Sequence, residues 1–131
     1  MYGHYDAKDT SILVDGTYIT GLGEDMFSAE KDEDFFSESV GAQGDVVTSE
    51  TNNPLGTFTL HVQSTSPSKK FLMGLKNRDE AFPIWAINKK LGERVGGTMA
   101  KLQSMPEIAR GAEAEDMEFT FKVFDYTVEM I

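Results

Sequence analysis

Strict alternation of apolar and polar residues is the feature that most limits what this chain can fold into. In the run 56–63, Phe58, Leu60 and Val62 occupy every second position, with polar residues between them. The run 117–124 alternates in the same way. Because successive side chains of a β-strand point to opposite faces of a sheet, both runs predict strands with one face on a core and the other on water or a neighbouring molecule.

Other strand signals surround these two runs. Residues 11–14 and 17–20 flank Asp15-Gly16, a dipeptide that favours a two-residue turn, and together they predict a β-hairpin. Asn52-Asn53-Pro54 is a turn by composition. Residues 105–111 are expected to form a loop or a short helical turn. Further strands are expected over 26–31, 45–51, 82–88 and 94–101.

A single helix is expected over residues 68–77. Ser66, Pro67 and Ser68 suit the cap and the first turn of a helix. Phe71, Leu72 and Leu75 follow at helical spacing, which indicates packing against a core. The fold class is therefore mainly β, an antiparallel sandwich or barrel of about seven or eight strands with one packed α-helix. A length of 131 residues suits a single domain, 1–131.

The charge is concentrated in the first half of the chain. Twelve Lys and Arg against 22 Asp and Glu give −10. Residues 1–65 hold two bases and 12 acids (2 − 12 = −10), whereas residues 66–131 hold ten of each. Such an acidic surface disfavours specific nucleic-acid binding, which needs clustered Lys and Arg, and a solvated acidic face is its simplest interpretation. The densest stretch contains Glu24, Asp25, Glu30, Asp32, Glu33, Asp34, Glu38, Asp45 and Glu50.

The motifs of common enzymes are missing or incomplete. The chain has no Cys and two His, which excludes disulfides and Cys-ligated metals. Gly21-Leu22-Gly23 begins like a dinucleotide fingerprint, but Met26 stands where the third glycine belongs. Residues 32–34 match only part of a calcium-loop pattern, and no Ser lies in a nucleophile-elbow context. The sequence predicts no enzyme, no cofactor, no metal and no membrane binding, and the absence of a signal-like N-terminus leads us to expect a cytoplasmic origin.

Two aromatic residues interrupt the acidic stretch. Phe35 and Phe36 stand beside the loop 41–44. They either point into the core or belong to a projecting loop, 32–44, that anchors in a neighbouring subunit, since buried aromatics are favoured interface anchors. Strand edges at 12–14 or 119–124 are candidates for sheet extension between subunits.

An ordered series of short segments suggests a family. Residues 14–21, 27–36, 40–46, 48–53 and 56–68 resemble tail tube proteins of contractile-tailed bacteriophages, with the match clearest over 10–70. The resemblance implies a virion subunit, assembled in the bacterial cytoplasm, that forms hexameric rings. The inner strands of a ring would join into one larger β-barrel, and stacked rings would form a hollow tube through which DNA passes without specific binding.

The resemblance also implies partners and surfaces, namely further copies of the chain, a sheath, a baseplate and a tail terminator. Six copies would carry 6 × −10 = −60 per ring, and an acidic lumen would repel phosphate. Two other interpretations remain open. One is a related ring-forming terminator, baseplate tube segment or secretion-tube component, and the other is a small acidic binding module or hydrolase. The expected surfaces are a lumen lined by some of the nine acids, a ring-stacking loop with Phe35, Phe36, Val40, Gly41 and Gly44, and an outer helix offering Lys69, Lys70 and Lys76 to the sheath.

Overall fold

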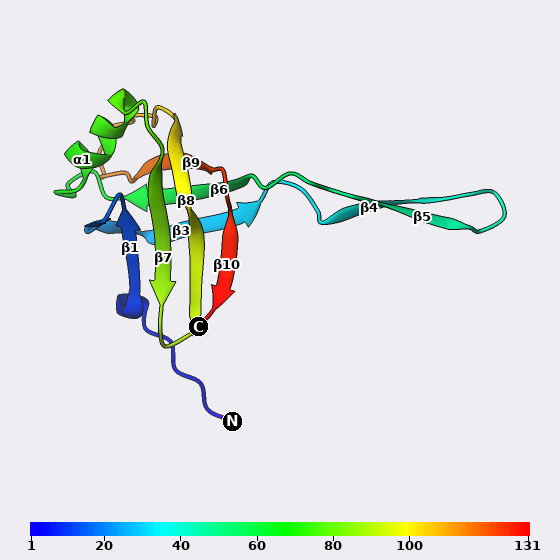
Figure 1. The fold of residues 1–131 in the computed structure, drawn as a ribbon. Helices are drawn as coiled ribbons and strands as arrows, with labels where there is room; N and C mark the ends of the chain where they lie inside the picture. The colour runs from blue at the N-terminus through cyan, green and yellow to red at the C-terminus, as the bar shows by residue number, and fades with distance from the viewer.

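The computed structural model describes all residues of the chain, 1–131, and consists almost entirely of antiparallel strands (Figure 1). Eight strands form one sheet in the order β2-β1-β7-β8-β9-β6-β3, with β10 beside β8, and β4 and β5 form a separate pair. In chain order the elements are β1 Thr10–Val14, β2 Thr17–Tyr18, β3 Leu22–Lys31, β4 Phe36–Val40, β5 Val46–Glu50, β6 Gly56–Val62, α1 Lys69–Gly74, a 3-10 turn Leu75–Asn77, β7 Phe82–Asn88, β8 Glu93–Ser104, β9 Met117–Val123 and β10 Thr127–Met130, preceded by a 3-10 turn at Ala7–Asp9.

The large sheet curls so that its two ends face each other across one core. In Figure 1, β1, β7, β8 and β10 lie along one direction, and β3 and β6 cross them. Crossed layers of this kind are one of the two stable ways of packing sheet on sheet. This confirms the predicted mainly β sandwich with one packed helix. The core consists of Ile12, Val14, Ile19, Phe58, Leu60, Val62, Leu72, Leu75, Phe82, Ile84, Ala86, Ala100, Met117, Phe119, Phe121 and Val123.

The two alternating runs form the centre of this core. β6 pairs with β9, and Phe58 lies opposite Phe121 while Leu60 lies opposite Phe119. All four side chains are fully buried. Between them, His61 and its polar neighbours on β6 remain partly exposed on the other face. The period-two pattern therefore predicted both the strands and their buried face correctly.

The predicted turn at Asp15-Gly16 is present. Both residues have a positive φ, 53° at Asp15 and 78° at Gly16, as a type I′ hairpin turn requires. The turn brings Leu13 opposite Tyr18. The returning strand β2 has only two residues, so the hairpin is shorter than the sequence predicts.

The helix lies where it was expected, but the serines before it do not cap it as the sequence predicts. α1 and the following 3-10 turn cover residues 69–77. The side chain of Ser68 makes no capping bond to the helix; its Oγ instead accepts a hydrogen bond from the backbone N–H of Thr20 at 3.1 Å. Ser66 Oγ donates to the Thr20 carbonyl at 2.5 Å. Both serines therefore tie the start of the helix to the end of the first hairpin.

A corner in β8 allows one strand to pair with two successive partners. Residues 93–96 of β8 pair with β10, and residues 100–104 pair with β9. Gly96 at this corner has a φ of 142°. The Asp125 carboxylate, between β9 and β10, accepts the backbone N–H groups of Thr98 and Met99, each at 3.0 Å. Burial raises the pKa of Asp125, but the hydrogen bond from the Thr98 hydroxyl, followed by those from the backbone N–H groups, outweighs it and lowers the pKa overall.

Three sequence-based expectations need correction. The segment 32–44 is not a simple loop, because residues 36–40 form β4 and pair with β5. Neither candidate strand edge is free, because β9 at 119–124 lies between β6 and β8, and β1 at 12–14 lies between β2 and β7. The strand β10 was not predicted. The unpaired long edges belong instead to β3 and β10, while residues 105–111 form a loop as expected.

Candidate functional site

The most prominent surface feature is a two-stranded ribbon that projects far beyond the β body (Figure 1). We define the projecting ribbon as residues 32–51, with β4 and β5 paired from Phe36↔Glu50 to Val40↔Val46. Residues 36–40 alone span roughly 15 Å at the ordinary rise of a strand. Every residue from 32 to 50 is exposed. The chain itself therefore leaves most of the ribbon's apolar surface uncovered.

The two faces of the ribbon differ in chemistry. Residues directly opposite each other across an antiparallel pair share a face. One face carries Ser37, Ser39, Val47 and Ser49. The other, which we call the aromatic-acidic face, combines three apolar with two acidic side chains, so it suits a partner that is both apolar and basic. Its members are Phe36, Glu38, Val40, Val46, Thr48 and Glu50.

Phe35 and Phe36 do not point into the core. Their side chains are 75% and 50% exposed, which excludes the inward alternative. The Lys31 ammonium lies 5.8 Å from the centre of the Phe35 ring, within the range of a cation–π contact. Val40 and Val46 share the face of Phe36 and are also exposed, which gives an apolar surface that a monomer would leave in water, and such surfaces commonly mark an interface.

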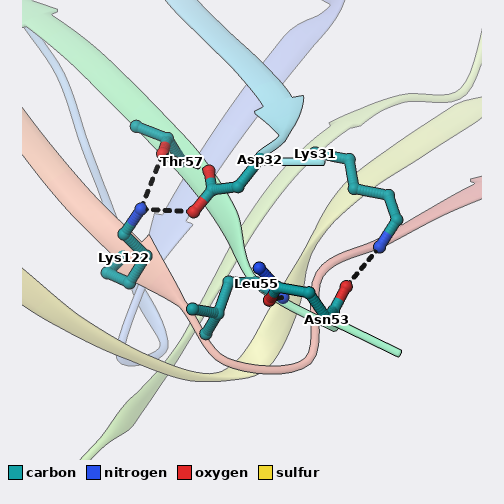
Figure 2. Close-up of polar contacts among 6 residues, drawn as sticks. All are labelled: Lys31, Asp32, Asn53, Leu55, Thr57 and Lys122. Carbon is teal, nitrogen blue, oxygen red and sulfur yellow. Dashed lines mark hydrogen bonds and ion pairs between the residues drawn. The ribbon is translucent and has the colours of Figure 1, made fainter. Parts of the chain in front are cut away.

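The base of the ribbon is fixed to the β body by polar contacts (Figure 2). Lys122 on β9 donates to the Asp32 carboxylate at 2.5 Å, and Thr57 on β6 donates to the same group at 2.7 Å. Lys31 donates to the Asn53 carbonyl at 2.5 Å. These bonds join both strands of the ribbon to the sheet, so the direction of the ribbon is set at its base.

The same contacts lower the pKa of Asp32 below its ordinary value of 3.8, chiefly through the hydrogen bond from Lys122 and then that from Thr57. Because the folded-state pKa lies below the unfolded one, the carboxylate stabilises the fold above the unfolded pKa, and the contribution is lost as pH falls through the folded value.

We therefore expect Asp32→Asn to lower the free energy of unfolding at pH 7 by about 1 kcal/mol, since it weakens a partly buried charged pair. The difference from the unsubstituted chain should be smaller at pH 2 than at pH 7, because Asp32 loses its charge as pH falls through its folded-state pKa. Urea unfolding at both pH values measures this. Asp34→Asn is the matched control, because Asp34 is exposed on the same segment. A difference of equal size at both pH values would contradict the assignment.

The structure distributes the nine candidate lumen acids over three places. Glu24, Asp25 and Glu30 lie exposed on β3. Asp32 is engaged with Lys122 at the ribbon base. The five others lie on the projecting ribbon, away from the curled sheet; they are Glu33, Asp34, Glu38, Asp45 and Glu50.

The outer face of the sheet is polar where it is formed by β3, β6 and β9. Phe27 and Ala29 of β3 pack against the core, so the alternating Ser28 and Glu30 lie on the opposite face. The neighbouring strands β6 and β9 add short or charged side chains there. This surface, which we call the polar sheet face, comprises Ser28, Glu30, Thr57, Thr59, His61, Glu118, Thr120 and Lys122. The sequence pattern identified its β6 part, but only the strand order joins it to Glu30 and Glu118.

The helix offers cations and a shallow groove. Lys70 and Lys76 are exposed, and Lys69 donates to the Ser64 carbonyl at 2.8 Å. The groove beside α1 has a volume of about 560 Å³. Sequence reasoning identified the lysines but missed the groove, which appears only when the 3-10 turn brings Arg78 alongside the helix. Its lining consists of Pro67, Lys70, Phe71, Gly74, Leu75 and Arg78.

The structure holds no group of three or more His, Asp or Glu side chains that could bind a metal ion. None of its helices has the length and apolar character needed to cross a lipid bilayer.

Three solved structures share this fold. The chain is similar to the tube-terminating cap of the anti-feeding prophage, with a TM-score of 0.69 and 13% identity over 100% of this chain and 95% of that one. It is similar to the sheath/tube terminator of an extracellular contractile injection system, PVC, in the extended state, with a TM-score of 0.64, 13% identity and 98% of each chain covered. It is also similar to a chain of the PVC sheath-tube complex in the extended state, with a TM-score of 0.63 and 14% identity over 96% of this chain and 91% of that one.

At these identities the likeness establishes the fold. No curated protein sequence matches the chain. A family model does match, described as the bacteriophage PhiTE tail tube protein, and it covers residues 8–125. The match includes strands β1 to β9 and the entire projecting ribbon, and it ends just before β10. The chain therefore belongs to the bacteriophage PhiTE tail tube protein family, whose members are structural tail proteins and not enzymes.

Proposed function

We propose that the chain is the repeating subunit of a phage tail tube, in which hexameric rings stack into a hollow conduit for the genome. The observation that carries the proposal is the projecting ribbon. An isolated two-stranded ribbon is at best marginally stable in water, and this one exposes five large apolar side chains. A surface of this kind is useful to a chain that buries it in a neighbouring copy.

Free strand edges support ring formation. β3, ten residues long, lies at one end of the sheet, and β10 pairs only with β8. Unpaired edges are templates for pairing with another chain, and closing a ring through them removes the hazard of uncontrolled association. We propose that such edges join neighbouring subunits within a ring.

The polar sheet face is our candidate for the wall of the bore. It has no large apolar side chain, which suits a surface that faces water in the assembled tube. Of the nine sequence-predicted acids, Glu30 lies on this face, with Glu24 and Asp25 on the same strand. Negative charge there would repel DNA phosphates over about 8 to 10 Å at ordinary salt, which favours passage without binding.

The acids and apolar residues of the ribbon have a different role in this proposal. We assign them to ring stacking, together with Val40, Gly41 and Gly44 near the tip. The lysines of α1 are proposed to face outward, towards a sheath protein. A baseplate and a tail terminator would complete the partners of the tube in the virion.

A terminator that forms a single ring is the second candidate. The fold of the chain also supports this candidate, because two of the similar structures are described as a tube-terminating cap and a sheath/tube terminator. The two functions differ in length control, since a terminator ring does not add further rings.

Negative-stain electron microscopy of the purified chain over a concentration series tests the proposal. We expect hollow tubes whose length grows with concentration, because a stacking interface that does not close on itself yields open polymers. Single rings at every concentration would favour the terminator, and dispersed monomers at every concentration would contradict both. Helical reconstruction of the tubes then tests whether the polar sheet face lines the bore.

A further inference from the structure

The groove beside α1 is an apolar surface without a partner in the chain itself. Phe71 is only partly buried and Gly74 is exposed. Lys70 takes part in none of the four ion pairs. Arg78 is already paired with Asp15 at 2.6 Å, yet its side chain remains 39% exposed. The groove therefore has an apolar floor and a basic rim that are open to a ligand.

The charges of the groove and of the projecting ribbon are opposite. Residues 64–78 contain four bases, Lys69, Lys70, Lys76 and Arg78, and no acid. The ribbon, residues 32–51, contains six acids and no base. Opposite charge speeds encounter and selects the partner and its register. The aromatic-acidic face also carries apolar side chains. The ribbon and the groove are therefore complementary both in charge and in apolar surface.

The groove and the ribbon of one molecule cannot meet. In Figure 1 the ribbon leaves one side of the β body, and α1 lies at the opposite side. Any contact between the two surfaces is therefore between different copies. Since the two surfaces are different, the contact is heterologous and leaves one ribbon and one groove free at the ends, which permits continued stacking.

We propose that the groove beside α1 receives the aromatic-acidic face of the ribbon from a second copy of the chain. Phe36 lies against Phe71 and Leu75 in this contact, and Glu38 and Glu50 face Lys70 and Arg78. The inference rests on the proposed function and deepens it, because it names the surface that the ribbon binds. It assigns Lys70 to the neighbouring subunit and leaves Lys69 and Lys76, which lie outside the groove lining, to the sheath.

Disulfide trapping tests the contact directly, because the chain contains no Cys. Thr48→Cys places a thiol on the aromatic-acidic face and Gly74→Cys places one in the groove. Thr48 is exposed, and a Cβ added at Gly74 meets no atom within 4 Å, so both variants should fold. Oxidation of the doubly substituted chain should give a ladder of multimers on a non-reducing gel. A mixture of the two single variants should give dimers only.

Ser49→Cys with Gly74→Cys is the matched control, since Ser49 is an equally exposed neighbour on the other face of the ribbon. We expect the Thr48 pair to cross-link at least about tenfold more than the Ser49 pair, because a disulfide needs Cβ atoms roughly 3.5–4.5 Å apart.

The possible outcomes separate the groove contact from tube formation itself. Tubes without preferential cross-linking of the Thr48 pair would overturn this inference and leave the proposed function standing. A complete absence of assembly by the unsubstituted chain would overturn the proposed function and this inference with it. A thiol at Gly74→Cys that stays reactive in bare tubes and becomes protected only when sheath protein is added would assign the groove to the sheath instead.

Discussion

Replacing Phe35 and Phe36 together with alanine should abolish tube formation and leave the β body folded. Buried aromatic anchors each contribute about 2 kcal/mol or more to an interface. A combined loss of about 4 kcal/mol per contact raises the concentration needed for assembly by several hundred-fold, on the order of 10³. Both rings are exposed in the single chain, so the unfolding temperature of the monomer should change little. Electron microscopy and thermal unfolding measure the two effects separately.

Ser37→Ala with Ser39→Ala is the control for this pair. These residues lie on β4 beside Phe36, are also exposed and occupy the face of the ribbon opposite to Phe36. The control should assemble like the unsubstituted chain. If the double phenylalanine variant remains folded and still forms tubes of normal length, the ribbon is not the stacking element.

Gly96→Ala should destabilise the β body itself. Gly96 has a φ of 142°, which L side chains rarely adopt. A Cβ at this position would press on the backbone carbonyl of Ile84 in the paired strand β7. Backbone cannot move aside as a flexible side chain can. We expect a loss of about 3 kcal/mol in the free energy of unfolding, or roughly 10 °C in Tm for a chain of this size.

Gly111→Ala provides the comparison for this variant. A Cβ at Gly111 meets no atom within 4 Å and the residue lies in an exposed loop. Its unfolding temperature should stay within a degree or two of the unsubstituted chain. Equal unfolding temperatures for the two variants would contradict the close approach of β7 and β8 at the corner.

Local patterns were sufficient for most of the fold. The alternation of apolar and polar residues predicted β6, β9 and their buried faces. It could do so because successive side chains of a strand point to opposite faces of the sheet. The Asp15-Gly16 turn and the helix near Leu72 were predictable for the same reason, since turn chemistry and helical spacing act over a few residues. Strand β10 escaped prediction because it is only four residues long, and its apolar residues Val128 and Met130 are exposed and do not pack on the core.

The candidate surfaces depended more on tertiary structure. Residue types alone indicated that Phe35 and Phe36 were unusual within an acidic stretch, but both an inward and an outward placement agreed with the sequence. The pairing of β4 with β5 decided between them, because it carries the segment away from the core. Likewise, Lys122 follows Asp32 by 90 positions, and no local pattern joins two residues so far apart.

The sequence by itself determined the mainly β class, the acidic first half, the absence of Cys chemistry and the resemblance to a tail tube family. These properties follow from composition and from interactions between near neighbours along the chain. Only the tertiary structure decided which strands have free edges, that the acids divide between the sheet and the ribbon, and that a basic groove lies opposite an acidic ribbon. Such arrangements arise from contacts between distant residues, whose pairing is selected by the packing of the whole core.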